Sequence, residues 1–401
     1  MISKMTGKER LADSGMKHHD GGLYVHVAYC RSKCIYCDFF SAGDRIADWR
    51  RYVDALCSEF RYRIEELAWP LRTIYFGGGT PSLLPEREFM RLCAFLKPFM
   101  ETVEEFTIEV NPDDVSEDML AVWERGGVTR LSMGIQSFDD SVLRAIGRRH
   151  DGHTAVQAYR MARNVFDNIS IDLMFGLPGQ TLDMWRNDIH LALELRPEHI
   201  SAYSLMYEEG TALTLLRDSG RLEEAPEELS EMMFRMLIEE LSEAGYDHYE
   251  ISNFALPGFR SRHNSSYWLQ KPYIGLGPSA QSYDGDSVRK GNSADLRGYI
   301  RHWTSGNEDD GCSEEYLMET EHLTVGELKE EYVLTRMRMR EGIPLRDFFD
   351  RFGEEACSTL IKNARSLAEN GMVSLSDSNI SLTENAILLS DAVILALASD
   401  C

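Results

Sequence analysis

The sequence predicts an α/β protein in which six strand–helix units form an open, partial barrel, followed by a smaller helical domain. Short apolar strands alternate with amphipathic helices over residues 23–205, and such alternation is typical of a parallel sheet with helices outside it. Polar and glycine-rich residues collect just after the strands, as they do at the functional end of a parallel barrel. Six units, rather than the eight of a closed barrel, favour an open one. A doubly wound sheet has the same alternation and stays an alternative.

The strands and helices follow in a regular order. The first strand is expected at residues 23–27, where apolar and polar residues alternate directly before a loop with three cysteines. Five more apolar segments are expected to be strands: 73–76, 106–110, 130–135, 168–174 and 199–205. The segments between them carry apolar residues at helical spacing, which predicts helices at 49–67, 86–99, 117–125, 153–165 and 182–195.

The regular alternation of short strands and helices ends after residue 210. Segment 226–244 predicts a long helix whose methionine-rich face belongs to the core, and residues 246–285 are dense in glycine and aromatic residues. Near the C-terminus we expect helices at 328–340, 345–352 and 355–370 and a hairpin of 373–375 with 380–382. Gly371 stands where a left-handed residue ends a helix. Helices followed by such a hairpin outline a winged-helix-like domain.

These patterns divide the chain into four parts. We expect a flexible N-terminal tail (1–21), a barrel with an extension (22–304), a linker (305–322) and a C-terminal winged-helix-like domain (323–401). A winged-helix shape suggests DNA binding, but the charge of the chain opposes contact with phosphates. The family resemblance described below implies instead that this domain is a lid over the barrel mouth and a docking surface.

The charge and hydropathy of the chain exclude several classes of partner. Its 42 basic and 66 acidic residues give a net charge of −24, which disfavours nucleic acid and anionic lipid. The sequence has no apolar run long enough to span a bilayer. Its N-terminal residues are polar and lack the apolar region of a secretory signal. We expect a cytoplasmic protein that is not an integral membrane protein.

Three of the eight cysteines lie together on the loop after the first strand, at Cys30, Cys34 and Cys37. Three thiolates on one short loop can each hold one iron of a cubane cluster, which leaves the fourth iron open to an external ligand. A structural zinc site is the alternative, but it takes four ligands and no second cysteine pair follows. The scattered cysteines are expected to be small core residues: Cys57, Cys93, Cys312, Cys357 and Cys401.

Two further motifs suggest ligand contacts. Residues Tyr75 to Pro81 read Tyr-Phe-Gly-Gly-Gly-Thr-Pro, and glycines after a strand let the backbone approach a ligand closely. A plain strand-to-helix turn is the alternative. Glu109 ends the third strand, where its carboxylate can accept hydrogen bonds from hydroxyl groups or an ammonium, or alternatively form an ordinary salt bridge.

The cysteine spacing is the signature of the radical S-adenosylmethionine (SAM) superfamily, which this chain therefore resembles. The resemblance implies a partial (β/α)6 TIM-like barrel and a [4Fe–4S] cluster on Cys30, Cys34 and Cys37. In that superfamily the open iron binds the amino and carboxylate groups of SAM, and an electron from the cluster cleaves SAM to a 5′-deoxyadenosyl radical. The protein supplies binding, orientation and exclusion of water.

From about residue 22 to residue 395 the chain is similar to the oxygen-independent coproporphyrinogen III oxidase group. Shared motifs are Gly-Gly-Gly-Thr-Pro, Glu-Val-Asn-Pro, Ser-Met-Gly-Ile-Gln-Ser-Phe, Ile-Gly-Arg-Arg-His and Ile-Asp-Leu-Met-Phe-Gly-Leu-Pro-Gly-Gln-Thr. The resemblance implies that the glycine-rich turn binds the methionyl amino group of SAM. It does not decide whether the chain binds one SAM molecule or two. The SAM-binding residues that it implies are Tyr24, Tyr36, Gly78, Gly79, Thr80, Glu109, Gln136, Arg148 and Asp172.

Two features divide the sub-families of this group. The oxidases carry a fourth cysteine two residues after the third, where this chain has Phe39. The chain also contains His263-Asn-Ser-Ser-Tyr-Trp268, a motif typical of the HemW family of heme chaperones, in which this histidine is linked to heme. His263 is therefore the candidate heme ligand, and a hydrogen-bonded core histidine is the alternative. Gln281 stands where the family usually has a histidine.

Three functions follow as hypotheses. The first is a HemW-like heme chaperone that binds SAM at a three-cysteine cluster and hands heme to membrane respiratory proteins. The second is a radical SAM oxidase that decarboxylates coproporphyrinogen III to protoporphyrinogen IX. The third is an electron-transfer or scaffold protein with a cluster but no use of SAM. The resemblance implies an electron donor such as flavodoxin or ferredoxin, and the chaperone hypothesis names heme as the ligand.

Overall fold

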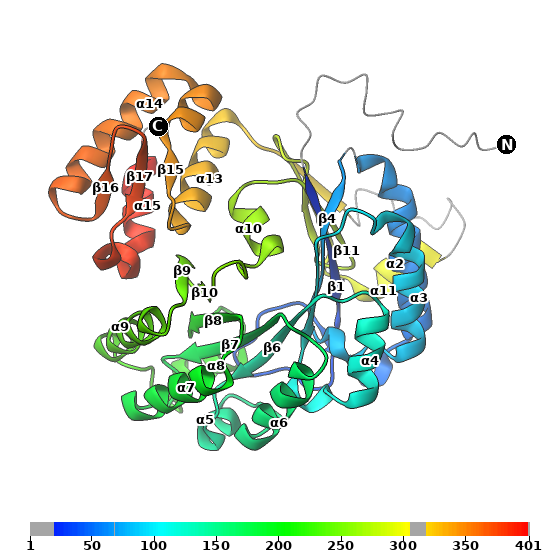
Figure 1. Ribbon diagram of the computed structural model, residues 1–401. Coiled ribbons are helices and arrows are strands. Elements are labelled where there is room, and N and C mark those ends of the chain that lie inside the picture. Colours follow the sequence, from blue (N-terminus) through cyan, green and yellow to red (C-terminus); the bar gives the residue numbers. More distant parts are fainter. Residues whose placement is uncertain (1–19, 68, 305–317, 400–401) are drawn as a thin grey trace.

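The computed structural model describes residues 20–67, 69–304 and 318–399 and contains one large twelve-stranded sheet (Figure 1). Its strands are β1 (Gly21–Val27), β4 (Leu71–Gly78), β5 (Glu105–Val110), β6 (Arg130–Gln136), β7 (Ile169–Phe175), β8 (His199–Ser204), β9 (Asp247–Glu250), β10 (Asn253–Ala255), β11 (Tyr273–Leu276), β12 (Gln281–Tyr283), β13 (Val288–Asn292) and β14 (Met318–His322). Their order in space is β14-β13-β12-β11-β1-β4-β5-β6-β7-β8-β10-β9.

The six predicted strands are confirmed as β1, β4, β5, β6, β7 and β8, which pair in parallel in chain order. A doubly wound sheet would reverse this order at a switch point, so that alternative is excluded. The sheet ends at β14 on one side and at β9 on the other, and the barrel is therefore open. A strand that was not predicted, β11, pairs in parallel with the other edge of β1.

Helices cover the outer face of this sheet (Figure 1). They are α2 (Trp49–Arg63), α3 (Glu86–Leu96), α4 (Glu117–Arg125), α6 (Gly152–Arg163), α7 (Leu182–Leu195) and α9 (Glu227–Glu243). The short helices α5 (Asp140–Ala145) and α8 (Ala212–Asp218) contribute to a separate apolar cluster beside the cysteine loop. Short 3-10 turns extend α2 and α3 to residues 66 and 99, close to the predicted ends. The short helices α5 and α8 were not predicted.

Strand residues alternate between an apolar outer face and a polar inner face. On β7, Ile169, Ile171 and Leu173 are fully buried in the core under the helices, whereas Ser170 and Asp172 have the opposite parity and point into the barrel. On the neighbouring strands, the following residues also occupy positions that face the inside of the barrel: Tyr75, Thr107, Glu109, Arg130, Ser132, His199 and Ser201. The barrel interior is therefore lined by polar side chains.

The methionine-rich helix α9 corrects one expectation. Met233 and Leu237, four residues apart on one stripe, are buried in the main core, as predicted. Met232 was assigned to the same core face but is 52% exposed. One helical step of about 100° turns its side chain away from that stripe.

The segment after β10 packs against the barrel near the N-terminal ends of its strands. Helix α10 (Arg262–Trp268) packs against β1 and β4, and the backbone N–H groups of Arg262 and His263 donate to Glu105 at the start of β5. Helix α11 (Leu296–Thr304) packs on α2. Because Glu105 and the first residues of β1 and β4 lie at the N-terminal ends of the strands, α10 lies at the end of the barrel away from the cysteine loop.

The C-terminal part has its own core and a three-stranded sheet in the order β15-β17-β16. Its elements are α13 (Val325–Arg338), β15 (Ile343–Pro344), α14 (Leu345–Glu369), β16 (Val373–Leu375), β17 (Asn379–Leu382) and α15 (Ser390–Ala398). The predicted hairpin is confirmed, as is the left-handed Gly371 at φ 71°. Gly353, at φ 87°, interrupts α14 between the two predicted helices.

Two expected boundaries shift. Of the expected linker, residues 305–317 lie outside the described residues, and 318–322 form β14, which pairs with β13 in the main sheet. Of the expected tail, residues 1–19 also lie outside the described residues. Gly21, which was assigned to the tail, belongs to β1 and pairs with Leu71. The C-terminal part contacts β9 and the turn after α10: Arg340 N–H donates to Tyr249 O at 3.0 Å, and Arg351 donates to Gln270 Oε1 at 2.9 Å. These contacts are not at the end of the barrel that carries the cysteines, where a lid was expected.

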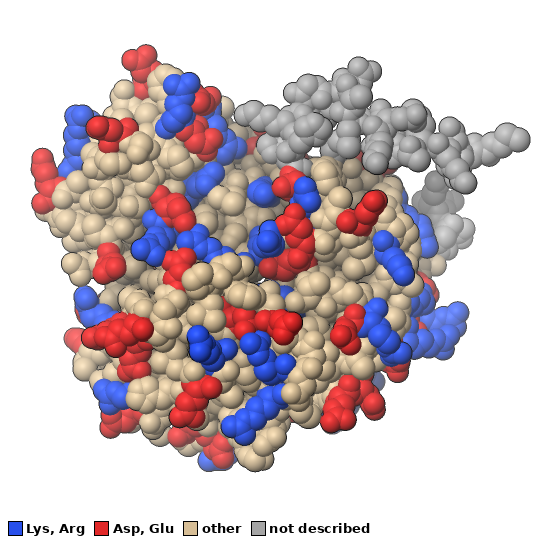
Figure 2. Space-filling model, in the orientation of Figure 1, with Lys and Arg blue, Asp and Glu red and all other residues tan. Residues whose placement is uncertain are grey.

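Two surface properties bear on the expected partners. Over the face that Figure 2 shows, acidic and basic side chains are interspersed and no large basic patch gathers. Among the helices of the described residues, none is long and apolar enough to cross a membrane.

Candidate functional site

The cysteine loop is held at both ends and along its length. Cys30 ends the short strand β2 (Tyr29–Cys30), which pairs with β3 (Ala42–Gly43) and closes the loop. His26 Nε2 hydrogen-bonds to Phe40 O at 2.9 Å. On its far side, Ile35 O accepts from Leu213 N–H at 2.8 Å. The loop is therefore positioned by β1 and by the segments that follow β8.

A cavity of about 560 Å³ opens between this loop and the carboxyl ends of the barrel strands. It is lined by every predicted cluster and SAM residue except Tyr24, and His263 is also absent from the lining. The predicted residues that line it are Cys30, Cys34, Tyr36, Cys37, Gly78, Gly79, Thr80, Glu109, Gln136, Arg148 and Asp172. Residues that are far apart in the sequence thus meet in one space of the size that small-molecule ligands occupy.

The donor set of the loop suits an iron–sulfur cluster better than a single metal ion. The thiols of Cys30, Cys34 and Cys37 are free and half-buried. In the described parts of the chain, no three histidine, cysteine or acidic side chains converge on one ion position. A cubane takes each thiolate on a different iron, so its ligands do not need to converge. Thr80 Oγ1 donates to Cys30 Sγ at 3.3 Å and Arg148 Nη1 donates to Cys34 Sγ at 3.6 Å.

The glycine-rich turn after β4 lies against the start of this loop. Gly78 has φ +100°, a left-handed conformation that favours glycine. Gly79 N–H donates to Val27 O at 2.8 Å. A Cβ atom on Gly79 would lie 2.6 Å from Val27 O and 2.7 Å from Tyr29 O, closer than atoms can pack. The turn therefore requires glycine for close contact with β1, and it presents its other backbone groups to the cavity.

Two carboxyl groups form the inner wall of the cavity. Tyr75 O–H donates to Glu109 Oε1 at 2.8 Å, and Ser132 O–H donates to Asp172 Oδ1 at 3.3 Å. Burial raises the pKa of Glu109 to about 7, with the Asp172 charge adding to the effect. Burial also raises the pKa of Asp172, against the opposing hydrogen bond from Ser201. A ligand that brings hydroxyl groups or a positive charge compensates this burial and favours the ionised carboxylates.

Gln136 and Arg148 are placed by irregular backbone. The pairing of β6 with β7 shifts register between Gly134 and Gln136, and Gln136 has φ 69°, a left-handed value rare for this residue. Such a bulge re-aims a side chain, here into the cavity. Arg148 donates to Asn111 Oδ1 at 2.8 Å and to Gly134 O. Its guanidinium therefore links the strand ends to the cysteine loop.

Tyr24 and His263 lie beneath the cavity. The Tyr24 ring stacks on Tyr75 with centroids 6.2 Å apart, so Tyr24 supports a lining residue. His263 is fully buried; its Nδ1 lies 2.7 Å from Thr73 Oγ1 and its Nε2 lies 2.8 Å from Tyr267 Oη. Burial lowers the pKa of His263 to about 3. In this arrangement neither ring nitrogen is free for iron, which is the geometry of the alternative, a hydrogen-bonded core histidine.

Several lining residues were given no ligand role in the sequence analysis, although some of them lie within its motifs. Tyr75, Ser132, Ser201, Tyr203 and Asn264 line the cavity as well. The first four sit at inner positions of predicted strands, so strict alternation along each strand would have found them. Asn264 comes from α10, which gives no such signal, because only the tertiary fold brings that helix beneath the barrel.

A buried cation lies below the carboxyl groups. Arg130 precedes Ser132 by two residues on β6 and is 1% exposed. Within the described structure its Nε and Nη1 atoms have no hydrogen-bond partner. Its charge opposes the effect of burial on the pKa values of Glu109 and Asp172. Arg130 therefore helps to keep both carboxyl groups ionisable inside the barrel.

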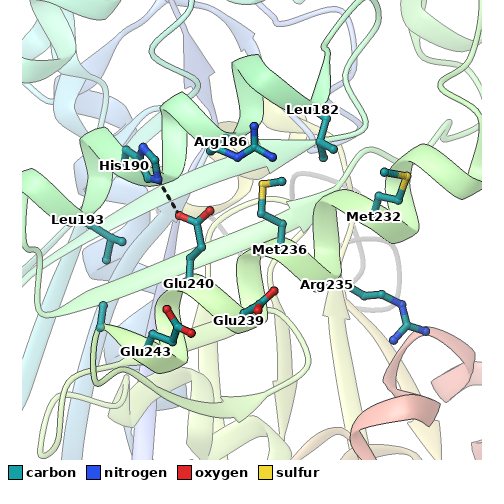
Figure 3. A pocket seen from close by; sticks show the side chains of 11 residues that line it. Leu182, Arg186, His190, Leu193, Met232, Arg235, Met236, Glu239, Glu240 and Glu243 are labelled. Atoms are coloured by element: carbon teal, nitrogen blue, oxygen red, sulfur yellow. Dashed lines mark ion pairs between the residues drawn. The ribbon is translucent and has the colours of Figure 1, made fainter.

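A second hollow, of about 810 Å³, lies on the outer surface between α7 and α9 (Figure 3). Leu182 and Met236 point into it, and His190 Nε2 pairs with Glu240 Oε2 at 3.1 Å. It shares no lining residue with the cavity at the cysteine loop. Although it is the larger of the two, it lacks the cysteines and the strand-end carboxyl groups, and we place the candidate site in the smaller cavity.

Comparisons with known proteins identify the family of the chain. The Radical SAM superfamily model matches residues 24–192, and the HemN C-terminal domain model matches residues 323–389. The "Heme chaperone HemW" of Bacillus subtilis is 35% identical over 376 residues, which are 92% of this chain and 97% of that protein. The "Heme chaperone HemW" of Lactococcus lactis is 34% identical over 84% of this chain and 86% of that protein.

The fold also matches a solved structure. The coproporphyrinogen III oxidase HemN of Escherichia coli, described as a radical SAM enzyme, aligns with a TM-score of 0.80 over 98% of this chain and 93% of that chain. The two are 22% identical, so this match supports the fold. The chain belongs to the radical SAM superfamily, to its HemN-like group and, within that group, to the family of the HemW proteins.

Proposed function

We propose that this chain is a heme chaperone that binds heme, carries a SAM-binding [4Fe–4S] cluster and hands heme to acceptor proteins. The observation that carries the proposal is the similarity to curated heme chaperones along 92% of the chain. Phe39 supports it, because the resemblance places the fourth cysteine of the oxidases at this position. Phe39 lines the cavity at the cysteine loop, where it offers an apolar surface and no thiol.

In this proposal the cavity holds both cofactors of the superfamily. Cys30, Cys34 and Cys37 would hold the cluster, which would supply an open coordination position for SAM. The glycine-rich turn contacts the methionyl part, Glu109 and Asp172 accept hydrogen bonds from hydroxyl groups, and Arg148 pairs with a carboxylate. When bound and reduced, the cluster would be a source of one electron for SAM. The remaining lining residues orient SAM and exclude water from it.

The partners and the compartment are part of the same proposal. Acceptors would be membrane respiratory proteins, and the cluster would receive electrons from a donor such as flavodoxin or ferredoxin. We place the protein in the cytoplasm. The cysteines Cys57, Cys93 and Cys357 are free and buried, which agrees with a reducing compartment. Cys312 and Cys401 lie outside the described residues.

One sample with two assays tests this function. The cluster is reconstituted anaerobically, and the protein is titrated with heme and then assayed with coproporphyrinogen III, SAM and a reductant. We expect saturable heme binding and no protoporphyrinogen. Protein with a full cluster that binds no heme would refute the chaperone proposal.

The oxidase stays the second candidate because the cavity brings together the residues that the oxidase group uses for SAM, including Gln136, Arg148 and Asp172. Oxidase activity would be identified by the formation of protoporphyrinogen IX in the same anaerobic assay. If cleaved SAM and protoporphyrinogen accumulate together, the oxidase replaces the chaperone. If SAM does not change the spectrum of the cluster, the electron-transfer or scaffold hypothesis applies.

A further inference from the structure

Three large apolar side chains lie exposed around the mouth of the cysteine-loop cavity. Phe39 is 62% exposed, Met206 is 67% exposed and Tyr203 is 40% exposed, and all three line the cavity. Phe39 comes from the cysteine loop, whereas Tyr203 and Met206 come from the end of β8 and the segment after it. We call these three residues the mouth rim. Exposed apolar side chains gathered at a cavity mark a place for an apolar ligand.

The two segments that carry the mouth rim are fastened to each other. Ile35 O accepts from Leu213 N–H at 2.8 Å. Ile35 and Leu205 belong to one small apolar cluster, which also contains Leu213. Because Ile35 lies four residues from Phe39 and Leu205 is next to Met206, these contacts fix both sides of the mouth rim. The apolar surface is therefore built into the fold.

The polar residues beside the mouth rim are of mixed sign. Lys33 lines the same cavity and is exposed, and within the described residues no ion pair is found for it. Asp38 and Glu208 line the cavity as well. A flat apolar ligand with anionic groups at one edge would turn that edge toward Lys33 and away from the two carboxylates.

Other places for heme are less suitable. Both ring nitrogens of His263 are hydrogen-bonded and the ring is fully buried, so iron cannot reach it without unpacking α10. The outer groove of Figure 3 offers His190 and two methionines, but none of the residues that line it is a tyrosine, phenylalanine or tryptophan. His190 is already paired with Glu240. A macrocycle in that groove would have no aromatic side chain to lie against.

We propose that heme binds at the mouth rim, with the Met206 thioether as an axial ligand of the iron and with Phe39 and Tyr203 against the macrocycle. This inference rests on the proposed function and deepens it. Methionine sulfur is a known axial ligand of heme iron, and aromatic side chains supply large apolar contact area. The propionates lie toward Lys33. Heme in this position covers the mouth of the cavity that holds the cluster and SAM.

The test uses the full chain with its cluster reconstituted, titrated with heme and followed by the Soret absorption. The variants are Met206→Leu, which removes the sulfur and keeps the apolar volume, and Phe39→Ala. Met232→Leu and Ile46→Ala are matched controls, since Met232 is 52% exposed and Ile46 64% exposed and neither lines this cavity. All four side chains are exposed, so the variants should fold, and iron content and thermal unfolding check this.

We expect Met206→Leu to shift the Soret band and each rim variant to weaken heme binding roughly tenfold, as truncation at the centre of a binding site does. The two controls should match the wild type. If the wild type binds heme and a Phe39→Ala/Met206→Leu double variant keeps the same Soret band and heme affinity, heme does not bind at the mouth rim. The chaperone proposal would then still stand. Wild-type protein that binds no heme overturns the proposed function, and the mouth rim with it.

Discussion

Replacing His263 by alanine should destabilise the protein even when neither heme nor cluster is bound. The side chain is fully buried, hydrogen-bonds to Thr73 and Tyr267, and stacks on Tyr75 with ring centroids 5.0 Å apart. Each buried hydroxyl that loses its partner costs about 1–3 kcal/mol. Removing a large buried side chain costs roughly 2–5 kcal/mol. Because these effects share one site they do not add fully, and we expect a loss of about 3–5 kcal/mol.

Urea unfolding of the cluster-free and heme-free protein, followed by circular dichroism, measures this loss. His263→Gln is the matched variant, because its amide can still donate and accept hydrogen bonds, and it should lose less than about 2 kcal/mol. A loss below about 1 kcal/mol in His263→Ala would refute the structural role, since such losses are typical of unimportant surface sites. Comparing the stability of the two His263 variants is necessary because a destabilised His263→Ala protein can lose heme even if His263 does not bind the iron.

Three further predictions concern the cavity. Because the pKa of the Glu109 carboxyl is raised to about 7, the group is neutral below this pH; SAM affinity, measured by calorimetry, should fall about tenfold per pH unit below 7, and a Glu109→Gln variant without this pH dependence is the control. A flat wild-type profile would contradict this role. Cys37→Ser should lower the iron content after reconstitution, whereas Cys93→Ser should retain it; a full iron complement in the first variant would show that Cys37 is no ligand. Gly79→Ala places a Cβ atom 2.6 Å from Val27 O and should lower the free energy of unfolding by about 3 kcal/mol, as read from urea unfolding; an unchanged midpoint would mean that the turn can relax.

The barrel strands were predictable because their signal is local. Each has a short apolar run and a polar or glycine-rich end, and parallel pairing in chain order follows from the helices between them. The helix 182–195 was predicted to the residue, because Thr181 caps its start and the apolar periodicity is regular. Strands β9 to β14 were not predicted as strands. They have three to five residues each, too few for a periodic pattern.

The cavity residues were predictable from motifs, whereas the environment of His263 was not. The motif around His263 suggested an available imidazole next to aromatic rings. Its hydrogen-bond partner Thr73 lies 190 residues earlier in the chain, and the stacking partner Tyr75 comes from the same strand. Only the insertion of α10 beneath the barrel brings them together. Met232 was assigned to the apolar face of its helix, but it lies one helical step from the buried stripe and is exposed.

Heme titration of wild-type protein with a fully reconstituted cluster tests the central claim most directly. The account predicts a saturable change of the Soret absorption and a heme–protein complex that survives gel filtration, in a sample that forms no protoporphyrinogen from coproporphyrinogen III. Protein that takes up its full cluster, binds SAM and shows no saturable heme binding would contradict it.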